Sequence, residues 1–248
     1  ILFSVSSDSE SITILESDSL GEAHNLKRGY GQSKWVADQL VMAASKRGIP
    51  TCVYRVPMIT ADRNTGVSNI KDRICRYIKG CIQLGMVPIL EDGELVDNWV
   101  PVNEISQAIV YLSQQETSFG KAFHVINPQP TSLNNLFAGI SSIYSSIKEV
   151  PLNDWVIALS NYPKNALHPY IFGLSSQIKN MTDKQSNLFY EHLQVTVNAP
   201  PKQVIIDSCN TQNGLLESEI TFSSIDKSYL EKMISYLNES GFLNLPKN

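Results

Sequence analysis

A tyrosine and a lysine four positions apart are the side chains of this sequence best suited to catalysis. Tyr30 and Lys34 lie within residues 29–37, GYGQSKWVA, at the start of an apolar-periodic stretch. Positions i and i+4 of a helix share one face, and an ammonium beside a phenol lowers the pKa of that phenol. The spacing therefore predicts an acid that releases its proton near neutral pH. The same spacing also occurs by chance on amphipathic helices, so the neighbouring elements must decide between the two interpretations.

Two short strands are expected to flank the helix that carries this pair. Residues 1–7 are apolar and end in serines, residues 8–28 are rich in Ser, Asp and Glu and predict a loop, and residues 51–56 are β-branched and apolar. Strand, helix and strand with tight connections indicate parallel strands joined by a crossover helix. The pattern therefore predicts an α/β sheet.

The helix itself is predicted from its apolar spacing and its end signal. Val36, Leu40, Ala43 and Ala44 give the expected core face. Lys46-Arg47-Gly48 is a C-terminal signal, because cations suit a helix end and glycine allows a left-handed cap.

The ends of the two strands point to carbonyl chemistry. Ser6 and Ser7 end the first strand, and Pro57 follows the second. Because the carboxyl ends of parallel strands open on one edge, these residues and the Tyr30–Lys34 face should converge on one crevice. Two hydroxyls there could bind a carbonyl oxygen, and one could protonate it. Arg55 is expected to form a structural ion pair at the strand end, and His124 to be a packed residue.

The remaining elements follow from periodicity and turn residues. A loop is expected at 57–68, and short strands are expected within 96–102, 121–126 and 204–206. Helices are expected at 69–84 and 104–113. A further helix should begin at Thr131 or Ser132, and the last should span 224–237 with Ser224 as its N-cap. From about residue 145 the segments are short and mixed, which favours a small, mostly helical lobe.

Composition excludes several classes of protein. The net charge of −4 disfavours a nucleic-acid-binding surface, and no apolar run is long enough to span a bilayer. The four cysteines and four histidines show no metal-ligand spacing, so no metal is predicted; the cysteines fit a reducing, cytoplasmic compartment. A chain that opens inside a strand is expected to be a piece of a longer one.

These residues carry a resemblance to a known family. Ser7, Tyr30 and Lys34 resemble the Ser/Thr-Tyr-Lys triad of the extended short-chain dehydrogenase/reductase superfamily. Residues 3–7, 29–34, 54–57 and 99–102, with a tail at 206–211 and 240–243, resemble the terminal thioester reductase domains of nonribosomal peptide and polyketide synthases and of carboxylic acid reductases. The resemblance implies the C-terminal part of a Rossmann-like, doubly wound parallel sheet in residues 1–130. It also implies a smaller, mostly helical substrate-binding lobe in residues 131–248, with an insertion at 66–95 directed to that lobe.

The resemblance also implies a role for each site residue. Ser7, with Ser6 as the neighbouring alternative, would bind the carbonyl oxygen, Tyr30 would donate the proton, and Lys34 would hold the nicotinamide ribose. Pro57, Met58 and Ile59 would lie against the nicotinamide. The reaction implied is NADPH-dependent reduction of an acyl thioester to an aldehyde, or on to an alcohol. The thioester would be carried on coenzyme A or on the phosphopantetheine arm of a carrier protein within a larger multidomain chain, and the domain would be a monomer.

One expected motif is absent from the sequence. No Gly-x-x-Gly-x-x-Gly follows a strand, so the turn that cradles a dinucleotide pyrophosphate should precede residue 1. Three alternatives stay open: a fatty acyl-CoA reductase, another extended dehydrogenase or epimerase, and a non-catalytic fragment that only binds a partner.

Overall fold

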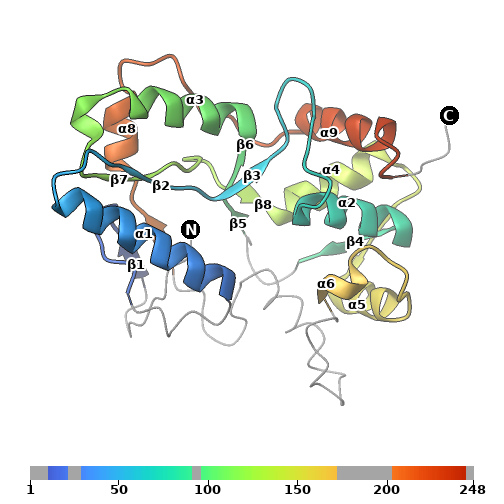
Figure 1. Ribbon diagram of the computed structural model, residues 1–248. Helices are drawn as coiled ribbons and strands as arrows, with labels where there is room; N and C mark the ends of the chain where they lie inside the picture. Colours follow the sequence, from blue (N-terminus) through green and yellow to red (C-terminus); the bar gives the residue numbers. More distant parts are fainter. Residues whose placement is uncertain (1–10, 22–28, 91–95, 172–202, 244–248) are drawn as a thin grey trace. The chain divides into compact units, whose positions relative to one another are not determined.

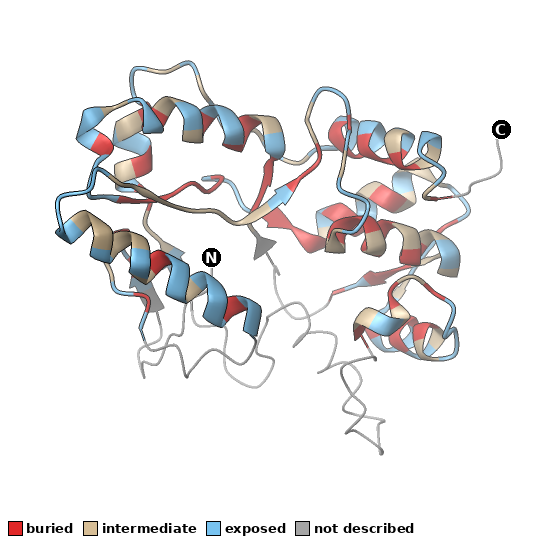
Figure 2. Ribbon diagram, in the orientation of Figure 1, coloured by how far each residue is buried: buried red, intermediate tan, exposed pale blue. Residues whose placement is uncertain are grey.

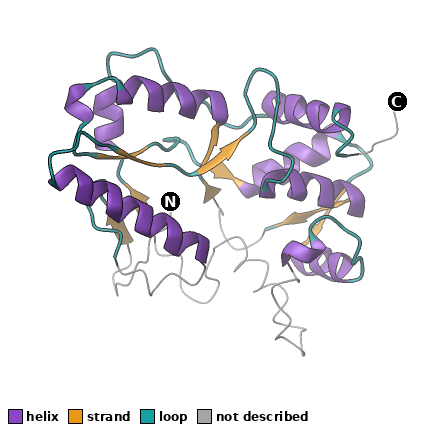
Figure 3. Ribbon diagram, viewed as in Figure 1, coloured by secondary structure: helices purple, strands orange, loops and turns teal. Residues whose placement is uncertain are grey.

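The computed structural model describes residues 11–21, 29–90, 96–171 and 203–243 (Figure 1). The chain divides into two compact units built from interleaved segments: unit 1 holds residues 1–59, 103–128 and 202–222, and unit 2 holds the rest. Helices and short strands alternate along much of the described chain (Figure 3), and the α/β class predicted from the sequence is confirmed. The boundary between two domains at residue 130, which the sequence predicts, stays a prediction.

Unit 1 consists of parallel strand pairs with helices beside them. Its elements are β1 (Ser11–Ile14), α1 (Gly29–Lys46), β2 (Val53–Arg55), the start of β3 (Met58–Thr60), α3 (Val102–Ser113), η2 (Glu116–Ser118), β7 (Ala122–His124), β10 (Gln203–Ile206) and α8 (Cys209–Leu215). β2 pairs with β7 and β1 pairs with β10, both in parallel register. α1 lies on one side of β2 and β7, and α3 and α8 lie on the other (Figure 1).

Two of the predicted loops contain strands. β1 (Ser11–Ile14) falls within the loop predicted at 8–28, and β3 (Met58–Thr60) falls within the loop predicted at 57–68. The polar composition around β1 concealed a β-branched run that pairs with β10, nearly two hundred residues away in the sequence. The strand predicted at residues 1–7 lies outside the described residues.

The core face predicted for α1 is wrong. Val36 and Leu40 are 46% and 66% exposed, whereas the buried residues of α1 are Gly31 and Asp38 (Figure 2). The face of α1 that is buried is therefore not the face that carries Val36 and Leu40. The end of α1 is as predicted, because Gly48 has a φ of 85°.

Unit 2 has the larger apolar core. Its elements are α2 (Arg73–Leu84), β4 (Met86–Ile89), β5 (Val96–Asp97), β6 (Trp99–Pro101), β8 (Thr131–Ser132), α4 (Leu133–Ile143), β9 (Lys148–Pro151), α5 (Leu152–Ser160), α6 (His168–Ile171) and α9 (Lys227–Glu239). β4 and β9 form a parallel pair, and β5 and β8 an antiparallel one. α2 ends at Gly85, which adopts the left-handed conformation at φ 65°. In the part of the chain that the structure describes, no helix is long and apolar enough to cross a membrane.

Helix α9 holds Thr60 and Ala61, the first residues of unit 2, through hydrogen bonds. The N-cap of α9 is Asp226 rather than the predicted Ser224, and its carboxylate accepts the Tyr229 N–H at 2.8 Å. The buried Tyr229 hydroxyl donates to Thr60 Oγ1 at 2.7 Å and approaches the Ala61 carbonyl oxygen at 3.0 Å. Thr60 and Ala61 continue directly from Ile59, so α9 fixes the chain immediately after a predicted cofactor-facing segment.

Gly66 provides a test of this anchorage. Its φ is 72°, and a Cβ at this position would lie 2.2 Å from the Lys232 carbonyl oxygen of α9. Gly48 has a similar φ of 85° with nothing within 4 Å of its Cβ position. We expect Gly48→Ala to lower the free energy of unfolding by about 1 kcal/mol through backbone strain. Gly66→Ala should lower it by about 3 kcal/mol or more, because backbone must also move.

Denaturant titration of the two variants measures this difference. An equal loss of unfolding free energy in Gly66→Ala and Gly48→Ala would mean that the loop containing Gly66 can move away from α9 without a free-energy cost.

Candidate functional site

Tyr30 and Lys34 lie together on the first two turns of α1. The Lys34 ammonium is 5.5 Å from the centroid of the Tyr30 ring, as the i, i+4 spacing predicts. Lys34 is exposed and Tyr30 is 70% exposed, so both polar groups are open to a ligand. A phenol and an ammonium on one accessible face suit a carbonyl oxygen and ribose hydroxyls.

The other predicted site residues are placed only in part. Pro57, Met58 and Ile59 follow β2 in unit 1; the first two are half-buried and Ile59 is 37% exposed. Ser7 and its alternative Ser6 lie outside the described residues. The convergence of these residues with Tyr30 stays a prediction.

A buried ion pair connects α1 to β2. Arg55, the last residue of β2, donates from Nε to Asp38 Oδ2 at 2.9 Å and from Nη2 to Asp38 Oδ1 at 3.3 Å. The two side chains are 8% and 7% exposed. Arg55 therefore forms the structural pair predicted for it, while its partner Asp38 was missed. An aspartate inside a periodic helix and an arginine inside an apolar strand are the signal, since each is costly to bury alone.

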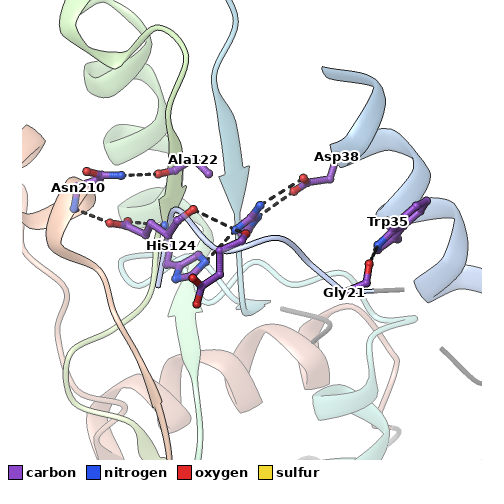
Figure 4. A network of polar contacts seen from close by, with 9 residues as sticks. Gly21, Trp35, Asp38, Ala122, His124 and Asn210 are labelled. Atoms are coloured by element: carbon purple, nitrogen blue, oxygen red, sulfur yellow. Dashed lines mark hydrogen bonds and ion pairs between the residues drawn. The ribbon is translucent and has the colours of Figure 1, made fainter. Parts of the chain in front are cut away.

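The same guanidinium contacts three further groups of unit 1 (Figure 4). Arg55 Nη1 lies 3.2 Å from the Glu16 carbonyl oxygen, 3.5 Å from that of Asp18 and 3.4 Å from His124 Nε2. Arg55 thus joins the chain after β1, the helix α1 and the strand β7.

A buried carboxylate completes the connection to α8. Glu16 is 3% exposed and accepts the His124 N–H at 2.7 Å and the Thr211 hydroxyl at 2.8 Å. It also accepts the backbone N–H groups of Asn210 and Thr211, in the first turn of α8. Ser208, the N-cap residue, makes no side-chain capping bond, so Glu16 supplies the acceptor that the helix start requires.

His124 is neutral in this network. It is fully buried, and its Nδ1 lies 2.7 Å from the Asp207 carbonyl oxygen, which requires a hydrogen on Nδ1. Nε2 then accepts from Arg55. Burial lowers the pKa of His124 and outweighs the hydrogen bond to the Asp207 carbonyl oxygen, which raises it; the neighbouring Arg55 charge lowers it further. The packed role predicted for His124 is confirmed.

A family model described as "Male sterility protein" matches residues 4–109, a range that includes Tyr30, Lys34 and Arg55. Over 239 residues the chain is 30% identical to a component of the linear gramicidin synthase of Brevibacillus parabrevis, covering 96% of this chain and 4% of that protein. It is 26% identical to the L-2-aminoadipate reductase large subunit of Eremothecium gossypii over 243 residues, covering 93% and 16% of the two chains.

A solved structure gives the deciding comparison. The terminal R domain from the myxalamid PKS-NRPS biosynthetic pathway matches with a TM-score of 0.73 at 30% identity, over 96% of this chain and 56% of that one. The chain is therefore similar to terminal reductase domains over almost its whole length. The resemblance predicted from the sequence is therefore confirmed, and so is a Rossmann-like fold of the extended short-chain dehydrogenase/reductase type. The chain spans about half the length of that solved domain and a small part of the curated relatives.

The buried His124 should make the folded chain less stable in acid. Because the folded-state pKa of His124 is lowered, the unfolded chain binds more protons below the ordinary histidine value of about 6.5. The free energy of unfolding should therefore fall as pH falls from about 6.5 towards 5. In His124→Asn, which offers a donor near Nδ1 but does not titrate, this pH dependence should be shallower.

Denaturant titrations at several pH values measure how the free energy of unfolding depends on pH in the wild type and in His124→Asn. Parallel slopes for the wild type and His124→Asn would mean that His124 does not remain neutral in the folded state.

Proposed function

We propose that this chain is the catalytic part of a reductase that converts an acyl thioester to an aldehyde with NADPH, or reduces it further to an alcohol. The observation that carries the proposal is the exposed Tyr30–Lys34 pair on α1, within the range that matches the family model. The relatives named above support the substrate class, because one belongs to a gramicidin synthase and another is a reductase of 2-aminoadipate.

The residues present fit the nicotinamide end of such a cofactor. The exposed ammonium of Lys34 can donate to ribose hydroxyls, and the exposed phenol of Tyr30 can reach a carbonyl oxygen beside the ring. Pro57, Met58 and Ile59 offer backbone and apolar side chains at a strand end, where ligands of parallel sheets bind. When bound, the cofactor supplies a hydride.

Tyr30 acts as the proton donor in this mechanism. Its phenolic proton passes to the carbonyl oxygen as the carbonyl carbon gains hydride, which gives a hemithioacetal. Ser7 would hold the same oxygen through a hydrogen bond. Lys34 stabilises the negative charge left on the phenol oxygen, since its ammonium lies 5.5 Å from the centroid of the Tyr30 ring. Breaking the carbon–sulfur bond, with return of a proton to sulfur, then releases thiol and aldehyde.

Unit 2 would receive the acyl chain and its carrier. We assign substrate binding to the 66–95 segment and to the part of the predicted lobe at residues 131–248 that lies in unit 2, with the thioester held on a phosphopantetheinyl carrier protein or on coenzyme A. The natural full-length protein would be a multidomain chain that acts as a monomer.

The direct test uses the natural full-length protein with NADPH or NADH and an acyl thioester on coenzyme A or on a carrier protein. We expect oxidation of NADPH, release of one thiol for each aldehyde formed, and a preference for the carrier-bound substrate. Oxidation without thiol release, or no oxidation with any thioester, would rule out the proposal. Cofactor binding without turnover would favour a partner-binding role.

Tyr30→Phe separates proton donation from binding. We expect turnover to fall by about 10² to 10⁴, the usual effect of losing a positioned acid, with NADPH affinity nearly unchanged. Tyr111→Phe is the matched control, because Tyr111 is a partly exposed tyrosine of α3 outside the predicted site. Single-turnover rates and cofactor titrations give both quantities, and an unaffected rate in Tyr30→Phe would remove it from the mechanism.

Lys34→Ala should change both cofactor binding and rate. Hydrogen bonds to charged groups contribute about 1.5 to 3 kcal/mol, so we expect roughly 10- to 100-fold weaker NADPH binding together with slower turnover. Lys46→Ala, at the opposite end of α1, is the control. If Lys34→Ala changed only the thermal stability, Lys34 would be a surface residue of the helix.

A further inference from the structure

Helix α1 has little apolar anchorage in unit 1. Among its described residues only Gly31 and Asp38 are buried, while Val36 and Leu40 are exposed. A helix that carries reacting groups must nevertheless be held within fractions of an ångström. Because Val41, Met42 and Ala44 are only half-buried, polar contacts must supply much of what fixes the position of α1.

Side-chain bonds of Trp35 and Asp38 join α1 to the rest of unit 1, and Thr51 Oγ1 adds a longer bond to the Val41 carbonyl oxygen at 3.4 Å. Trp35 Nε1 donates to the Gly21 carbonyl oxygen at 2.9 Å (Figure 4). The second contact is the two-pronged bond from Arg55 to Asp38, at 2.9 and 3.3 Å. The first involves an exposed region, whereas the second is almost fully buried and charge-assisted, which makes it the stronger of the two.

Arg55 is itself held by groups outside α1. Its Nη1 lies against the carbonyl oxygens of Glu16 and Asp18 and against His124 Nε2. These groups fix the plane of the guanidinium, and that plane in turn fixes the Asp38 carboxylate. The geometry requires several fixed donors, which arginine has and lysine lacks.

The positions along the chain connect this pair to the candidate site. Asp38 lies one turn after Lys34 and two turns after Tyr30, and Arg55 lies two residues before Pro57. We infer that Arg55 is a positioning residue, which through Asp38 holds the Tyr30–Lys34 face of α1 in place against the strand that leads to Pro57. The effect on turnover rests on the proposed function, whereas the effect on α1 does not.

The experiment compares Arg55→Lys with Thr211→Val in the natural full-length protein. Arg55→Lys keeps the charge but loses the two-pronged geometry. Thr211→Val removes a buried bond to the Glu16 carboxylate, so it weakens the same polar network on α8 without touching α1. Both variants are assayed at a temperature at which both are fully folded. Amide hydrogen exchange of α1 and steady-state kinetics with an acyl thioester are the two readouts.

We expect Arg55→Lys to speed exchange in the α1 amides by about tenfold or more and to lower kcat about 10- to 100-fold, with KM for the thioester within about twofold. Thr211→Val should leave α1 exchange and kcat within about twofold of the wild type. Asp38→Asn should change α1 exchange and kcat by as much as Arg55→Lys does. The double variant should lose no more kcat than the worse of the two single variants.

Unchanged α1 exchange in Arg55→Lys would overturn the inference, whatever the activity. So would an equal loss of kcat in Thr211→Val. If the wild type reduces no thioester, the proposed function fails, and hydrogen exchange alone decides whether Arg55 holds α1.

Discussion

The buried ion pair between Arg55 and Asp38 is the interaction on which the candidate site depends. A buried guanidinium and carboxylate each carry a large desolvation cost, which only close pairing and further hydrogen bonds can offset. Both conditions are met, because Arg55 binds Asp38 through two nitrogens and directs its third towards two carbonyl oxygens and His124. Loss of either partner would leave an uncompensated charge in unit 1.

The rest of unit 1 extends this polar arrangement. The Glu16 carboxylate joins the chain after β1 to β7 and to the start of α8, and neutral His124 links Arg55 to the Asp207 carbonyl oxygen. Segments that are distant in sequence are thus joined by charged and polar side chains where apolar contact is sparse. Unit 2 is different, because its helices pack on buried aliphatic and aromatic residues such as Ile78, Phe137 and Trp155.

Sequence reasoning was most successful where the signal was local. The C-terminal ends of α1 and α2 were predicted correctly, although α2 begins at Arg73 rather than at residue 69, and the Tyr30–Lys34 contact followed from spacing alone. It failed where partners are remote: β1 was hidden by polar neighbours until its pairing with β10 was known. The inward face of α1 was misjudged because a buried aspartate, not the apolar stripe, faces the sheet. No local pattern could have paired Asp38 with Arg55.

The coupling free energy between Arg55 and Asp38 tests this account most directly. A double-mutant cycle with Arg55→Met and Asp38→Asn, measured by denaturant unfolding, isolates that term. The exposed pair Lys227–Glu231, at 4.0 Å, serves as the internal reference and should couple by no more than about 1 kcal/mol. For Arg55 and Asp38 we predict a coupling of about 2 to 4 kcal/mol. A coupling no larger than that of the reference pair would contradict the claim that this ion pair holds α1 and its catalytic face.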